Sequence, residues 1–218
     1  MKKRYDILLF IATVLITIFG IIMIYSASSI WSAYKFNDAF KYVKNQAMFG
    51  IIGVILMLFI RKIDYDIYYK KTNKILIFCL ILLVLVLIPG IGSIRNGSRS
   101  WFGIGGFGVQ PSEAAKIGLI MFTSKYLEKS NKFIKDLKKG VFPILFILFL
   151  IFGLIMLQPD FGTGMIIVIS IIAMLFIAGV NMKFFVAGGA LGLVGIVVLI
   201  LIAPYRMDRI TSFLNPWS

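Results

Sequence analysis

Two oppositely charged residues lie close together at the start of a largely apolar stretch. Glu113 and Lys116 are three positions apart, so a helix would place them on one face, where they can form an ion pair. A lysine inside an apolar membrane helix is costly unless it faces a partner or a polar cavity. The spacing therefore leaves two interpretations open: a structural ion pair, or a polar cavity that binds a charged ligand.

A guanidinium and an indole precede this pair in the chain. Arg99 has a planar group that donates paired hydrogen bonds to phosphate, and Lys116 would add a second positive charge. Trp101 is either a residue of the membrane interface, where tryptophan is enriched, or a surface that packs against a ligand. Together these residues favour an anionic, amphipathic ligand.

Polar residues also mark the starts of two predicted helices. Gln110 is followed by Ser112, which is expected to cap a helix, and by Glu113, which is favourable in a first turn. Further along, residues 157–164 read LQPDFGTG, a tight turn between two apolar runs. Its Asp160 is either a solvated turn carboxylate or part of the same polar cavity as the charged pair.

Residues 89–111 form a glycine-rich segment with the sequence PGIGSIRNGSRSWFGIGGFGVQP. Gly103, Gly105 and Gly108 match the dinucleotide-binding pattern, but that pattern needs a preceding strand and a following helix in a βαβ unit. Here the segment separates two membrane helices, so we reject the match. We expect an extracytoplasmic loop that folds back only where protein or water satisfies its backbone, which makes it a candidate site.

The composition indicates a membrane protein. Hydrophobic residues make up 60% of the chain, and the mean hydropathy is +0.98, which is too apolar for a soluble domain of this size. The apolar residues come in long blocks separated by charged stretches, whereas outer-membrane barrels have weak alternating strands. The chain is therefore predicted to be helical.

Seven apolar blocks follow one another along the chain. They lie at residues 7–24, 47–60, 75–88, 112–126, 141–157, 162–180 and 184–202. The first block is longer than the core of a typical signal peptide, so we interpret it as a retained helix. The predicted fold class is an all-α integral membrane protein, a polytopic bundle of about seven transmembrane helices forming one membrane domain over residues 1–218.

The basic residues are distributed as expected for a membrane topology. Of the 23 lysines and arginines, 15 fall in residues 2–4, 61–74 and 125–139 and at Lys183, whereas 7 fall in residues 35–44, 95–99 and 206–209. This bias places the N-terminus and the lysine-rich loops in the cytoplasm. Anionic membrane lipids explain the net charge of +14 more simply than nucleic acid does, so no nucleic-acid partner is predicted.

Cysteine and histidine are almost absent. The sequence has one cysteine, Cys79, and no histidine, which excludes disulfides within the chain, histidine bases and histidine-ligated metals. No cofactor is evident. The sequence gives no support for a divalent cation, although a phosphate-bearing ligand would be compatible with one.

Four segments resemble the SEDS family, which comprises RodA, FtsW and SpoVE. They are YSASS at residues 25–29, GSRSWFGIGGFGVQPSEAAKIGLI at 97–120, LQPDFGTG at 157–164 and RITSFLNPW at 209–217. They occur in the family's order and extend over essentially the whole chain. The very short N-terminal tail slightly favours a RodA-like member.

The resemblance implies a glycosyltransferase of the bacterial cytoplasmic membrane that polymerises lipid II into peptidoglycan beside a class B penicillin-binding protein. A sugar hydroxyl would displace a lipid diphosphate, which requires cations near phosphate and a base near the hydroxyl. The family's signature positions then correspond to residues in the loop and at two helix starts: Arg99, Trp101, Gln110, Ser112, Glu113, Lys116 and Asp160. Arg99 and Lys116 would bind diphosphate, Glu113 would orient Lys116, and Trp101 would pack on the substrate.

One departure from the family pattern affects activity. Family members usually have about ten helices, and the family's candidate catalytic aspartate lies beyond the position that matches Ser218, so no catalytic residue is assigned. The expectation is a fragment or truncated product, or a chain without polymerase activity. The alternatives are a lipid-linked precursor flippase and a non-catalytic scaffold for a penicillin-binding protein.

Overall fold

The computed structural model describes residues 6–95, 97–103, 108–134, 136–190 and 192. Helices account for most of these residues, so the predicted all-α class is confirmed. The chain divides into two compact units, Met1–Ile67 and Tyr68–Ser218.

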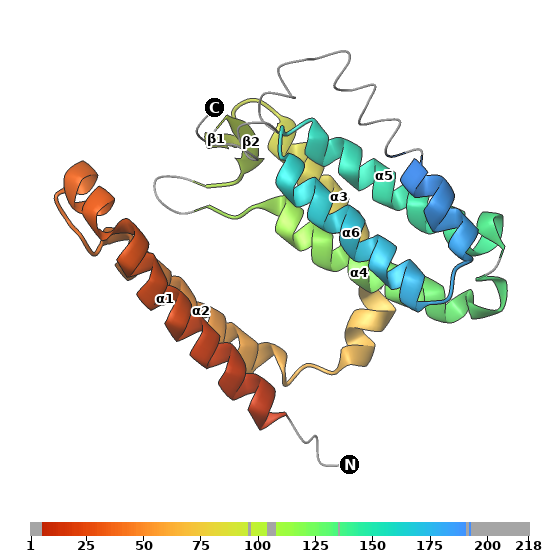
Figure 1. The fold of residues 1–218 in the computed structure, drawn as a ribbon, viewed down its shortest axis with the longest axis horizontal. Helices are drawn as coiled ribbons and strands as arrows, with labels where there is room; N and C mark the ends of the chain where they lie inside the picture. The colour runs from red at the N-terminus through yellow and green to blue at the C-terminus, as the bar shows by residue number, and fades with distance from the viewer. Residues whose placement is uncertain (1–5, 96, 104–107, 135, 191, 193–218) are drawn as a thin grey trace. The chain divides into compact units, whose positions relative to one another are not determined.

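The first unit contains two antiparallel helices, α1 (Ile7–Phe36) and α2 (Lys41–Ile60), which together form the helical hairpin (Figure 1). Asp6 caps α1 by accepting a hydrogen bond from the backbone N–H of Leu9 at 3.1 Å. At the other end, Asn37 adopts a left-handed conformation with φ 54°, which ends α1 and lets the chain turn back. The helices approach closely at Gly50, where an added Cβ would lie 3.4 Å from the Thr17 side chain.

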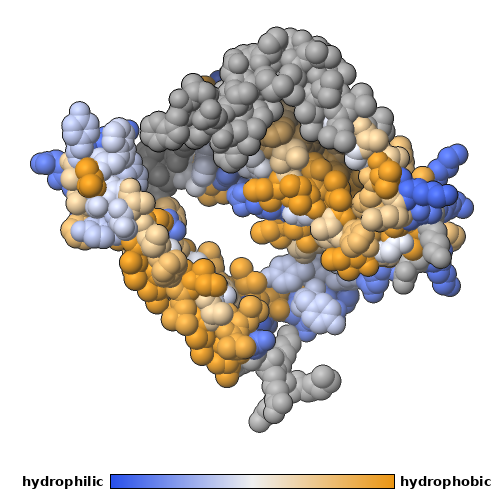
Figure 2. Space-filling view, viewed as in Figure 1, coloured by the Kyte–Doolittle hydropathy of each residue, from blue (hydrophilic) through white to orange (hydrophobic). Residues whose placement is uncertain are grey.

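The surface of the helical hairpin is strongly apolar. Figure 2 shows hydrophobic residues along most of its length, with polar residues gathered near its turn. In α1 only Ser32 is buried, and in α2 no residue is. Both helices are long and apolar enough to cross a membrane, as is the segment Leu137–Met156 of the second unit. An apolar surface of this kind is stable where lipid replaces water as the solvent.

The described part of the second unit contains a bundle of four helices, which we call the helical bundle. It consists of α3 (Tyr65–Leu87, whose first residues lie in the first unit), α4 (Pro111–Lys129), α5 (Phe142–Met156) and α6 (Phe161–Ile177). A 3₁₀ turn at Asn131–Phe133 and a π-helical turn at Leu137–Val141 connect α4 to α5. Residues 182–190 are also helical and correspond to the start of the predicted seventh helix, most of which lies outside the described residues.

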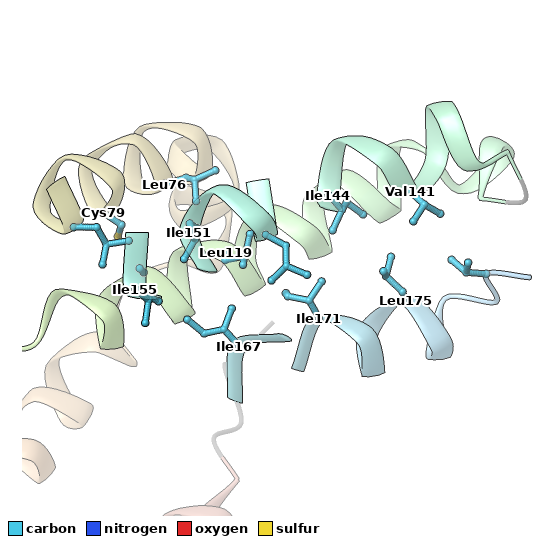
Figure 3. Close-up of a cluster of buried hydrophobic side chains, with 14 of the residues drawn as sticks. Leu76, Cys79, Leu119, Val141, Ile144, Ile151, Ile155, Ile167, Ile171 and Leu175 are labelled. Carbon is cyan, nitrogen blue, oxygen red and sulfur yellow. The ribbon is translucent and has the colours of Figure 1, made fainter. Parts of the chain in front are cut away.

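The core of the helical bundle follows from helical spacing. The buried residues of α5 recur every three or four positions, as do those of α6, so each helix buries one stripe. Figure 3 shows these stripes meeting α4 and α3 in one interior. The members that are at most 3% exposed include Cys79, Leu83, Leu119, Ile144, Leu148, Ile151, Ile155, Ile167, Ile171 and Leu175. Helices α3 and α4 touch where Gly118 leaves room for Cys79, since a Cβ there would lie 3.3 Å from the sulfur.

The predicted positions of the first six helices are confirmed, but several of their bounds are wrong. Helix α1 continues to Phe36, and α3 begins at Tyr65, about ten residues beyond each predicted apolar block. The added segments contain Ser, Ala, Tyr, Asn and Lys, which tolerate helical conformation although they contribute little to an apolar pattern. The helices are therefore longer than their apolar parts.

Candidate functional site

The glycine-rich segment at residues 89–111 contains a short β-hairpin that sequence analysis did not predict. Strands β1 (Ser93–Arg95) and β2 (Ser98–Trp101) pair antiparallel, with Ile94 opposite Arg99. Gly97, at φ +80°, occupies a turn conformation that other residues rarely adopt. The register shifts between Ser93 and Ile94, so Ser100 is an extra residue, a β-bulge. The two strands bring Arg99 and Trp101 into one ordered element.

Hydroxyl groups attach this β-hairpin to the turn between α5 and α6. The hydroxyl of Ser98 donates to the backbone carbonyl of Gln158, and the Ser100 hydroxyl lies 3.4 Å from the same carbonyl oxygen. Gln158 is fully buried, and its side-chain amide lies 3.4 Å from the Leu83 carbonyl in α3. The β-hairpin thus rests on a buried turn that also contacts the end of α3.

Arg99 is half-buried, and its aliphatic stem packs against the chain at Gly92. A Cβ added at Gly92 would lie 2.9 Å from the Arg99 Cγ and would overlap the Val86 carbonyl at the end of α3. Glycine is therefore required at this position by the close approach of another backbone. Among the described residues, Arg99 has no ion-pair partner.

The predicted residues Gln110 and Asp160 lie together. The Gln110 side-chain nitrogen donates to Asp160 Oδ2 at 2.6 Å, although the two residues are fifty positions apart. The other carboxylate oxygen of Asp160 accepts from the backbone N–H of Thr163 at 3.2 Å and so caps α6. Asp160 is therefore not a simple solvated turn carboxylate: it links the start of α6 to the residue that precedes α4.

The charged residues at the start of α4 form an ion pair, one of the two arrangements that their spacing left open. Lys116 Nζ lies 3.0 Å from both carboxylate oxygens of Glu113. The Lys116 side chain is 21% exposed and that of Glu113 is 58% exposed, so the lysine is the more enclosed partner. This contact supports a structural role for the pair, and it also holds the ammonium in one place, as a binding role would require.

The start of α4 differs from the prediction at Ser112. Gln110 precedes the helix and Pro111 takes the first helical position, where the missing N–H of proline costs nothing. Ser112 therefore lies inside the first turn, fully buried, and its hydroxyl has no hydrogen-bond partner among the described residues. The predicted Ser112 cap is wrong because Pro111 starts the helix and Gln110, two residues before Ser112, takes the capping position.

The structure brings the predicted site residues into three groups. Arg99 and Trp101 lie on the β-hairpin, Gln110 joins Asp160, and Glu113 joins Lys116. A pocket of about 630 Å³ adjoins the β-hairpin, but Gly90–Ser93, Phe102 and Gly103 line it rather than the charged residues. Within the described ranges, no three His, Cys, Asp or Glu side chains are arranged to hold a metal ion.

Sequence reasoning assigned no role to Ser98 and Ser100, which attach the β-hairpin, and did not predict that the Gln158 backbone receives them. Their contacts join positions about sixty residues apart, and no local pattern shows such pairing. The one available signal was the alternation of serine with Arg99 and Trp101, which is typical of a short strand.

Comparison with known proteins identifies the relatives of this chain. A family model described as "Cell cycle protein", covering FtsW, RodA and SpoVE, matches residues 6–218. The chain is 49% identical over 217 residues to stage V sporulation protein E of Bacillus subtilis (strain 168). The matched region is 100% of this chain and 59% of that protein. It is 38% identical over 216 residues to a probable peptidoglycan glycosyltransferase FtsW of Geobacter sp. (strain M18), covering 99% of this chain and 59% of that one.

Two solved structures share the fold. One belongs to a peptidoglycan synthase complex that coordinates polymerization and crosslinking. Its TM-score is 0.71 at 25% identity, and the match covers 93% of this chain and 59% of that chain. The other is the rod shape determining protein RodA of Thermus thermophilus, with a TM-score of 0.62, 25% identity and coverages of 82% and 58%. The chain thus spans about 59% of the length of these curated relatives. SpoVE, FtsW and RodA proteins all occur among these relatives, so the preference for a RodA-like member stays a prediction.

Proposed function

The chain belongs to the FtsW, RodA and SpoVE family of cell cycle proteins, and from this premise we propose that it binds lipid II as part of a peptidoglycan glycosyltransferase. The observation that carries the proposal is the grouping of polar side chains at the starts of α4 and α6, beside a β-hairpin that carries Arg99. The Gln110–Asp160 bond and the Glu113–Lys116 pair hold these side chains in place. Curated relatives carry the name peptidoglycan glycosyltransferase.

The chemistry of lipid II suits these residues. Its diphosphate is an anion next to a long hydrocarbon chain, so a binding site needs cations at the edge of an apolar surface. Arg99 would bind phosphate oxygens through paired N–H groups, and Lys116, oriented by Glu113, would add a point charge. Trp101 would pack against the sugar or the lipid. Gln110, Ser112 and Asp160 would shape the polar end of the site.

The first experiment measures binding of fluorescent lipid II to the chain in lipid nanodiscs. Arg99→Ala and Lys116→Ala should each weaken binding about tenfold, because each removes a charge-assisted hydrogen bond. Lys35→Ala is the matched control: it removes an exposed lysine at the end of α1 and should leave binding unchanged. If both site variants bind lipid II as tightly as the unaltered chain, the phosphate role is wrong and the ion pair is purely structural.

The same preparation tests the reaction itself. We expect lipid II binding without glycan strands from these 218 residues, because both carboxylates of the site are engaged, Asp160 by Gln110 and Thr163 and Glu113 by Lys116. A general base must reach the attacking hydroxyl. Strands that form with this chain and disappear with Asp160→Ala would make Asp160 the base. Translocation of lipid II in vesicles without polymerisation would favour the flippase alternative.

The proposed setting is the bacterial cytoplasmic membrane, with the N-terminus in the cytoplasm and a class B penicillin-binding protein as partner. The partner proposal rests on the similarity to a chain of a peptidoglycan synthase complex. The orientation rests on the basic residues and is tested by cysteine labelling in intact cells with Cys79→Ser as background. A cysteine at Ile94 should react with an impermeant reagent, and one at Lys132 should not. The reverse pattern would invert the topology.

A further inference from the structure

The strand β2 has two faces with different surroundings. Ser98 and Ser100 turn toward the α5–α6 turn, where both hydroxyls meet the Gln158 carbonyl. Arg99 lies between them and pairs with Ile94, whose side chain is 61% exposed. Ser98 and Arg99 are successive residues paired in register with β1, so their side chains point to opposite faces, and Arg99 shares its face with the exposed Ile94.

The anchor point is itself held firmly. Gln158 is completely buried, and its side-chain amide reaches the Leu83 carbonyl in α3. Two residues later, Asp160 receives the Gln110 hydrogen bond and caps α6. The carbonyl that receives the serine hydroxyls therefore belongs to a turn fixed to three other parts of the helical bundle.

The bulge at Ser100 adds a local reason for this arrangement. A bulge places one extra residue in a strand and redirects neighbouring side chains, which is why bulges occur beside binding sites. Ser100 is that extra residue here, and it is 1% exposed. In this bulged strand, the buried Ser100 approaches the same carbonyl as Ser98.

We infer that Ser98 and Ser100, bound to the Gln158 carbonyl, are positioning residues that orient Arg99 toward the diphosphate of lipid II. This inference rests on the proposed function, because it assigns the serines a role through Arg99. The serines touch no substrate themselves. Their contribution to binding should therefore exist only while Arg99 is present.

The test combines a mobility measurement with a double-mutant cycle. A spin label on a cysteine at Ile94, in the Cys79→Ser background, reports the order of the β-hairpin without ligand. The variant Ser98→Ala/Ser100→Ala should increase the label's mobility and weaken lipid II binding in nanodiscs about fivefold, the effect of losing one to two neutral hydrogen bonds. In an Arg99→Ala background the same double change should alter affinity less than about twofold.

Two further variants control for general damage to the fold. Ser98→Thr/Ser100→Ala keeps one hydroxyl and should restore most of the affinity and order. Ser170→Ala removes a hydroxyl that bonds only within its own helix, to Ile166 at 2.7 Å, and should change neither measurement. A serine effect that is equal with and without Arg99, or a label whose mobility does not change, would overturn the inference. Failure of the unaltered chain to bind lipid II would instead overturn the proposed function, and the label would still decide whether the serines anchor the β-hairpin.

Discussion

The helical hairpin and the helical bundle are both built from apolar helices, yet they are held together differently. In the bundle, α5 and α6 bury one stripe each against α4, and polar contacts join residues fifty to seventy-five positions apart. In the helical hairpin, most apolar side chains are exposed, and the polar contacts of α1 are local, such as those of Thr13, Thr17 and Ser32 with positions four to six residues away. The difference shows that apolar composition alone does not reveal where a protein core lies.

The two regions have different roles in a membrane. An exposed apolar helix face is stable among lipid chains and needs no protein partner, so the outward faces of the helical hairpin can remain uncovered by protein. The bundle gains packing energy from close-fitting side chains, and that rigidity holds the starts of α4 and α6 in register. A site that must position several charges is therefore expected on the bundle.

The largest predicted effect compares isoleucines from the two regions. Changing Ile151, which is 0% exposed in the bundle, to alanine should lower the free energy of unfolding by about 2–5 kcal/mol, because the change leaves a cavity. Ile16, 71% exposed on α1, leaves no cavity and should cost less than about 1 kcal/mol. Reversible unfolding in mixed micelles measures both. Equal losses would mean that α1 is packed as tightly as the bundle.

The next prediction compares two glycines. Gly92→Ala would push a methyl group into the Val86 carbonyl and the Arg99 stem, and should destabilise the protein by about 1–3 kcal/mol while weakening lipid II binding. Gly53 of α2 has nothing within 4 Å of an added Cβ, so Gly53→Ala should be neutral or stabilise by up to about 1 kcal/mol. Thermal unfolding of the two variants, together with the nanodisc binding assay, checks both effects. If Gly92→Ala changed neither stability nor binding, the backbone at the end of α3 would have to move easily to make room for the methyl group.

Particular residues show how far the sequence could predict this structure. The six helices were predictable because long apolar runs have few alternatives in a membrane. The spacing of Glu113 and Lys116 allowed an ion pair, which the structure contains, but it could not decide between that pair and a cavity for a charged ligand. The ends at Phe36 and Tyr65 were missed because polar residues can continue a helix without extending its apolar pattern.

The rest of the site depended on tertiary contacts. The Gln110–Asp160 bond joins two helix starts that only the folded bundle brings together. The β-hairpin is so short that its serine alternation gives only a weak strand signal, and no local pattern shows that its serines bind a carbonyl sixty residues away. At Ser112, local reasoning gave the wrong cap because a proline competes for the same helix start.

A third prediction compares two aspartates that cap helices. Asp6 accepts one hydrogen bond at the start of α1, whereas Asp160 caps α6 and also receives Gln110 from another helix start. Asp160→Ala should therefore cost about 2 kcal/mol, which combines a lost cap with a lost charge-assisted bond. Asp6→Ala should cost clearly less. Gln110→Ala should reproduce part of the Asp160 loss, and additive losses for Gln110→Ala and Asp160→Ala would show that the bond contributes nothing.

The smallest predicted effect is a dependence on pH at the turn of the helical hairpin. Asp38 lies between α1 and α2, where its carboxylate accepts hydrogen bonds from Lys44 Nζ and from the Phe40 backbone N–H, each at 2.9 Å. The Lys44 hydrogen bond, followed by that of Phe40, lowers the pKa of Asp38 below its ordinary value of 3.8. Both bonds favour the ionised carboxylate, so they stabilise the turn while Asp38 is charged.

The sign of the pH effect follows from this lowered pKa. The contribution of Asp38 to stability is complete above the ordinary pKa of 3.8 and is lost as the pH falls through the lower pKa of the folded state. Asp38→Asn should therefore be less stable than the unaltered chain at pH 7, and the difference should shrink as the pH falls below 4. Because the Lys44 side chain is 68% exposed, salt should also reduce the difference. Hydrogen exchange at the backbone of residues 37–41 measures this stability difference locally. A difference that persists at low pH would show that the charge of Asp38 is not what stabilises the turn.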